Sequence, residues 1–172
     1  FDSGAATFRL DKERLVLRRF ELAHAGARST GEISIPLADW QLDSTAQMRG
    51  SVSLRNVGAS DIARIAGIAA PLGGRITANA SVAGTLDLPS GTLDMDWRDA
   101  AFGPERVQRL SASLRTTVGP MPDVAGEIIL DGDVVKLAAT YNHQRGDWRI
   151  GQLRVQLGAA KMNLARLESL IA

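Results

Sequence analysis

The 172-residue sequence predicts a mainly β protein, built as a curled antiparallel sheet with two short amphipathic helices. Apolar and polar residues alternate with a period of two through almost the whole chain, which is typical of strands with one apolar face. Glycine and alanine recur on the apolar parity, where small residues allow a sheet to curl. Apolar residues follow helical spacing in only two short stretches, so we expect little helix.

Composition excludes several classes of protein. The chain carries 20 basic and 19 acidic residues, and this balance argues against a nucleic-acid partner. It has no cysteine, which excludes disulfides, cysteine-ligated zinc and cysteine nucleophiles. No apolar run approaches the roughly 20 residues that cross a bilayer. Because the sequence begins at Phe1, we interpret it as a segment excised from a longer chain.

The alternation predicts ten strands in chain order. They are residues 6–10, 15–22, 27–35, 40–54, 74–88, 93–97, 110–118, 124–130, 135–141 and 148–155. The stretch 40–54 is unusually long, so it is either one strand or two joined by a bend near Gly50. Pro89 to Gly91 is predicted to break the fifth strand, and Asp131-Gly132 predicts a tight hairpin.

Two segments lose strict alternation. The apolar parity flips between Leu17 and Phe20, and again between Ile150 and Leu153. One extra residue in a strand resets the face in this way, so each flip predicts a β-bulge. The two segments share one pattern, which indicates a weak internal repeat.

The first helix is predicted from Ile62, Ile65 and Ile68, with Ser60 as its N-cap. Leucines at 164, 167 and 170 predict a second helix with a similar sequence, IARIAGIA against LARLESLIA. Each helix follows a run of strands. We therefore interpret residues 1–172 as a single segment of a repeat domain, with approximate units 1–72 and 73–172.

The apolar face of such a sheet must be covered, and two short helices are too few. A second sheet, closure of the sheet on itself, or a ligand remain as alternatives. The residues predicted to line this face share the apolar parity of their strands. They are Trp40, Leu42, Ala46, Met48, Val52, Leu54, Ile76, Ala80, Val82, Leu86, Leu88, Leu93, Met95, Trp97, Leu114, Ile128, Leu137 and Ile150.

Residues able to carry out catalysis or hold a metal are few. His24 and His143 lie near predicted turns and have no obvious partner. Asp94, Asp96 and Asp99 suggest a cation site, but Asp94 and Asp96 lie on the polar side of a predicted strand, where carboxylates are commonly solvated. We therefore expect no catalytic residue, no metal site, no cofactor and no enzymatic activity.

A family resemblance rests on an ordered succession that comprises the stretch from Pro71 to Leu114 and the predicted helix before it. Its parts are an apolar helix over 62–71, then Leu72-Gly73-Gly74-Arg75-Ile76, Val82-Ala83-Gly84-Thr85-Leu86-Asp87-Leu88-Pro89, an alternating strand at 93–97, and Val107-Gln108-Arg109-Leu110. This succession resembles the repeat of the TamB and AsmA-like proteins. The pattern of apolar residues and glycines over residues 15–31 is also similar to that of the family.

The resemblance implies a taco-like or open-barrel β-groove with a hydrophobic interior. It implies a periplasmic segment of a protein anchored in the inner membrane of a diderm bacterium. The groove would shield phospholipid acyl chains during lipid transport to the outer membrane and would support outer-membrane protein assembly and secretion. An outer-membrane barrel similar to TamA is the implied partner. The family contributes no catalytic residues to any position of this chain.

One alternative stays open. The apolar face is instead packed by the protein's own side chains, and the segment is a structural or interaction module without lipid. In that case it would assist outer-membrane protein (autotransporter) assembly through a sheet edge or partner contacts.

Overall fold

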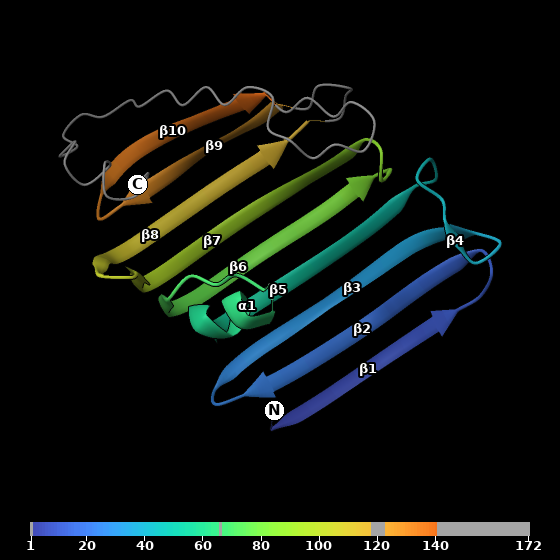
Figure 1. The fold of residues 1–172 in the computed structure, drawn as a ribbon, viewed down its shortest axis with the longest axis horizontal. Coiled ribbons are helices and arrows are strands. Elements are labelled where there is room, and N and C mark those ends of the chain that lie inside the picture. The colour runs from blue at the N-terminus through green and yellow to red at the C-terminus, as the bar shows by residue number, and fades with distance from the viewer. Residues whose placement is uncertain (1, 66, 118–122, 141–172) are drawn as a thin grey trace.

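The computed structural model describes residues 2–65, 67–117 and 123–140 (Figure 1). They form one antiparallel ten-stranded sheet and one short helix, which confirms the mainly β prediction. The elements are β1 (Ser3–Leu10), β2 (Arg14–His24), β3 (Ala27–Ala38), β4 (Gln41–Leu42), β5 (Met48–Gly58), α1 (Ala59–Ile65), β6 (Leu72–Gly84), β7 (Pro89–Phe102), β8 (Glu105–Thr116), β9 (Asp123–Leu130) and β10 (Asp133–Thr140). The predicted second helix and the strand at 148–155 lie outside the described residues.

The strands follow one another across the sheet in chain order. The order is β1-β2-β3-β5-β6-β7-β8-β9-β10. The short β4 lies off this path and pairs with β3. Figure 1 shows these strands side by side in one layer, with β1 and β10 at opposite edges. Across the described ranges the sheet is open and does not close into a barrel.

A bulge in β2 confirms the first predicted parity flip. Leu17 pairs with Ile33 and Phe20 pairs with Gly31, so Arg18 and Arg19 together oppose one residue of β3. The extra residue keeps both Leu17 and Phe20 on the same face, which is how a bulge restores an alternation. The second predicted flip, at 150–153, falls outside the described residues.

The stretch 40–54 is not one strand, and its break does not fall near Gly50. The chain reverses at Asp39 and Trp40, whose φ angles are 51° and 71°, and β4 pairs back onto β3. Asp43 then accepts hydrogen bonds from the backbone N–H of Thr45 at 3.0 Å and of Ala46 at 3.1 Å. These local bonds replace ladder bonds, so a turn interrupts an alternation that remains intact in the sequence.

The break that was predicted at Pro89 falls earlier, at residues 85–88. Gly84 has a φ of 100°, and the Thr85 hydroxyl accepts the Leu88 N–H at 3.0 Å. Pro89 begins β7 instead and pairs with Gly84. Proline lacks a backbone donor and is tolerated at the first residue of a strand.

Helix α1 begins at Ala59, so Ser60 lies inside its first turn and is not the N-cap. Gly67, with a φ of 69°, follows the helix, and the Ile68 N–H bonds to the Ala63 carbonyl at 2.9 Å. This six-to-one bond is typical of the Schellman motif that ends helices. Ile62 packs against the core, whereas Ile65 and Ile68 are 75% and 50% exposed. The predicted isoleucine stripe is therefore only partly correct.

The main core cluster lies where α1 meets the sheet. Its buried members are Ala59, Ile76, Ala78, Trp97 and Ala100. The Trp97 ring is tilted at 58° against Phe102, with 4.7 Å between the ring centroids. Its Nε1–H donates to the Gly73 carbonyl at 2.8 Å, so the one polar atom of this buried ring is satisfied. Trp97 therefore fills the core and does not line an open surface.

Replacing Trp97 with Phe should destabilise the protein by about 1–3 kcal/mol, because the Gly73 carbonyl loses its donor in a buried setting. Urea unfolding followed by circular dichroism measures the change. Trp40→Phe is the matched control, since Trp40 is 63% exposed and should change stability by less than about 0.5 kcal/mol. Equal effects from the two substitutions would contradict this role for Trp97.

The β1–β2 turn depends on ionised Asp11. The pKa of Asp11 lies below its ordinary value because its carboxylate accepts the backbone N–H groups of Glu13 and Arg14 and lies beside Arg9. A lowered carboxyl pKa stabilises the fold above the unfolded-state pKa, and this stabilisation is lost as pH falls through the folded-state value. An NMR titration should place the Asp11 carboxyl pKa below 3.8, its ordinary value.

Asp11→Asn is the control, because the amide oxygen still accepts the turn hydrogen bonds but does not titrate. We expect the wild type to be the more stable near neutral pH and the difference to shrink in acid. A difference that is constant with pH would show that the Asp11 charge does not contribute.

Candidate functional site

The register places opposite chemistry on the two faces of the sheet. One cross-strand row runs through all nine strands of the main path with no polar residue. It comprises Ala6, Phe20, Gly31, Val52, Ala80, Leu93, Leu114, Gly126 and Leu137. The adjacent row lies on the other face and is polar from β2 to β10. It comprises Glu21, Thr30, Ser53, Asn79, Asp94, Ser113, Glu127 and Lys136. We name these the apolar face and the polar face.

Most of the apolar face is only half-buried. Val52, Ala80, Leu93 and Leu114 all retain intermediate exposure in the central row. Within the described residues, α1 is the one element outside the sheet that packs on this face, and its contacts are with β5 and β6. The apolar face away from α1 therefore has no protein layer over it in the described part of the chain.

The glycines of the apolar face do not leave free space above the sheet. A Cβ on Gly31 would lie 2.5 Å from Cε1 of Phe20 and 2.6 Å from the Ser51 carbonyl oxygen. The aromatic ring of the neighbouring strand thus already occupies that space. Larger neighbours leaning over glycines produce a continuous apolar surface.

The structure places eleven of the eighteen predicted lining residues on strands of the apolar face. They are Met48, Val52, Leu54, Ile76, Ala80, Val82, Leu93, Met95, Trp97, Leu114 and Ile128. Five others lie in turns or in the two-residue β4, at one end of the sheet. They are Trp40, Leu42, Ala46, Leu86 and Leu88. Leu137 lies in β10 opposite Gly126, and Ile150 lies outside the described residues.

Residues of β2 and β3 also belong to the apolar face but were not among the predicted lining. Leu17, Phe20 and Leu22 of β2 lie opposite Ile33, Gly31 and Ser29 of β3. The period-two alternation of both segments could have predicted that these residues belong to the apolar face. Their inclusion extends the apolar face to the β1 edge.

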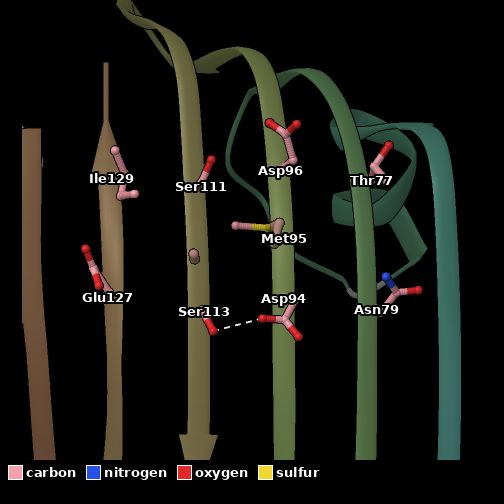
Figure 2. Close-up of a pocket in the computed structure, with 10 residues that line it drawn as sticks. Thr77, Asn79, Asp94, Met95, Asp96, Ser111, Ser113, Glu127 and Ile129 are labelled. Carbon is pink, nitrogen blue, oxygen red and sulfur yellow. Dashed lines mark hydrogen bonds between the residues drawn. The ribbon is translucent and has the colours of Figure 1, made fainter. Parts of the chain in front are cut away.

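The polar face bears a shallow cavity of about 410 Å³ over β6 to β9. Figure 2 shows the side chains around it, among them Asp94, Asp96 and Glu127. Ser113 donates to Asp94 at 2.8 Å, and Arg109 donates two bonds of 3.0 Å to Asp96. Asp94 and Asp96 thus already have protein partners, which fits a solvated polar surface better than a cation site.

No group of acidic or histidine side chains that could hold a metal ion occurs among the described residues. Asp99 has a φ of 50° and lies at the irregular end of β7. His24 does have a partner, contrary to expectation, because its Nδ1 is 3.3 Å from the Asp2 carboxylate. His143 lies outside the described residues.

Among the helices of the described ranges, none is long and apolar enough to cross a membrane.

Substituting Gly31 with valine should destabilise the fold by about 1–3 kcal/mol, because the new side chain must displace the Phe20 ring and meets the Ser51 backbone. Thr30→Val, one residue earlier and on the polar face, is a near-isosteric control and should change stability by less than about 0.5 kcal/mol. Urea midpoints at constant slope measure both effects. If Gly31→Val were tolerated equally, the space above Gly31 would be open.

Comparisons of the chain with protein-family models, with curated proteins and with solved structures find no match. The resemblance to the TamB and AsmA-like repeat therefore stays a prediction.

Proposed function

We propose that the apolar face shields phospholipid acyl chains, as one segment of a periplasm-spanning β-groove that supports lipid transport to the outer membrane. One observation carries this proposal. An apolar row crosses nine strands without interruption, and its members Val52, Ala80, Leu93 and Leu114 in the central strands remain partly exposed to solvent. Soluble proteins rarely leave so extended an apolar surface without a ligand or partner.

The energetics favour an acyl chain as the occupant. Burial contributes ~0.8 kcal/mol per CH₂ group, so a chain of about 16 carbons gains on the order of 10 kcal/mol relative to water. Binding of this kind needs no hydrogen-bonding group on the wall. The central row offers none from its side chains, which agrees with an apolar ligand.

The arrangement of the wider protein follows from the sequence resemblance. The sheet would curl into a taco-like groove with the apolar face inside, and neighbouring segments would continue it. The chain would belong to an inner-membrane-anchored protein of a diderm bacterium. A TamA-like outer-membrane barrel would be its partner in outer-membrane protein assembly. In this proposal the segment has no catalytic role.

The test compares two substitutions on one strand. Ala80 lies in the central apolar row of β6, and Ala83 lies three residues later on the exposed polar face. Ala80→Glu places a charge against acyl chains, which is costly in an apolar setting, and should reduce co-purifying phospholipid roughly tenfold or more. Ala83→Glu should leave the amount unchanged. Native mass spectrometry of the purified chain, with lipid extraction, gives the readout.

Circular dichroism and urea unfolding of both variants must show that they fold. Undiminished phospholipid in folded Ala80→Glu would contradict the proposal. Ala46→Arg would not test the face, because Ala46 lies in the turn between β4 and β5.

A lipid-free wild-type chain would favour the interaction module instead. The interaction module is supported by β1. Its eight residues are all exposed, and its outer edge pairs with no other described strand. Phe8 is 70% exposed on this strand. An unpaired edge with apolar side chains can accept a strand of another protein.

A further inference from the structure

A second cavity lies on the polar face over β2, β3 and β5, with a volume of about 440 Å³. Three arginines contribute to its lining, namely Arg14, Arg18 and Arg49, together with Glu32 and Ser34. The fold brings them together across three strands. Arg49 of β5 pairs in register with Ser34 of β3, and the bulge of β2 carries Arg18. Bulges commonly re-aim side chains toward a site.

The charges in this cavity are not balanced. Some arginines of the sheet have carboxylate partners, as in Arg28 with Glu21 and Arg109 with Asp96, each at 3.0 Å. None of the ion pairs in the described part of the chain includes Arg14, Arg18 or Arg49. Three guanidinium groups against the single carboxylate of Glu32 leave a net charge of about +2 around one concavity.

A buried hydroxyl adds a directed donor. Ser34 is only 7% exposed, although it lies on the polar face. Its Oγ accepts a hydrogen bond from Nη1 of Arg14 at 3.1 Å. The hydroxyl proton itself has no acceptor among the described residues, so it can donate to a ligand.

We propose that this cavity binds a phosphate group. A phosphate monoester carries about −1.5 to −2 charges at neutral pH, which matches the excess charge of the cavity. Guanidinium groups form short, charge-assisted, often bidentate bonds with phosphate oxygens. A ligand that carried a carboxylate in place of the phosphate would neutralise only one of the arginines. The phosphate can belong to a small soluble anion or to a lipid headgroup, and the site lies on the face opposite the apolar rows.

The first experiment is calorimetric titration of the 172-residue chain with inorganic phosphate at constant ionic strength. Arg49→Gln and, separately, Arg18→Gln should each weaken binding about tenfold, the effect of losing a hydrogen bond to a charged group. Arg55→Gln is the matched control. Arg55 lies on β5, is exposed and has no ion-pair partner among the described residues. It does not line the cavity, so its substitution should leave binding unchanged.

Glu32→Gln gives a result that structural damage would not imitate. Removing the opposing carboxylate should tighten phosphate binding, whereas general disruption of the site would weaken it. Equal weakening by Arg49→Gln and Arg55→Gln would overturn the proposal, because binding would then reflect diffuse charge.

A second arm identifies the source of the phosphate. Phosphatidylcholine vesicles containing phosphatidic acid are compared with pure phosphatidylcholine vesicles in a flotation assay. Binding that needs phosphatidic acid and falls in Arg49→Gln, without saturable binding of inorganic phosphate, assigns a lipid headgroup. Saturable binding of inorganic phosphate assigns a soluble anion. Absence of both overturns the proposal. Ala80→Glu should retain phosphate binding, so this result is separate from lipid shielding on the apolar face.

Discussion

The register of the antiparallel ladder is the constraint on which both faces of this sheet depend. Side chains alternate along a strand with a period of two, so a slip of one residue would carry a strand's apolar set to the polar face. The described strands hold one register in which an apolar row and a polar row each cross the sheet. Hairpins with positive φ angles, at Ala25-Gly26 and Asp131-Gly132, fix that register at its turns.

The bulge in β2 connects the two faces. It keeps Leu17 and Phe20 on the apolar face although they are three residues apart. The same irregularity supplies Arg18 to the cavity on the polar face. A single inserted residue thus preserves the apolar surface and concentrates positive charge behind it.

Period-two patterning was enough to predict most of the described strands and the β2 bulge, because each leaves a direct mark on the order of apolar residues. The Asp131-Gly132 dipeptide predicted the hairpin between β9 and β10. Where a turn depends on a side chain that bonds the nearby backbone, the order of apolar residues does not reveal it. Asp43 builds a turn inside an unbroken alternation, so Trp40, Leu42 and Ala46 were wrongly expected on one continuous strand. The arginine cavity was missed for a related reason, since Arg14, Arg18 and Arg49 are brought together only by the pairing of three strands.

The sequential order of the strands has a mechanical consequence. Every strand of the main path pairs only with strands that neighbour it along the chain, apart from the detour through β4. Stability in such a sheet approximates a sum of nearest-neighbour terms, as in repeat proteins. Under a pulling force along the sheet, hairpins would therefore detach one at a time from an edge, each opening its own short loop. A duplicated or deleted hairpin would alter the width of the sheet while leaving the remaining pairings intact, so width is the dimension that mutation can change most readily.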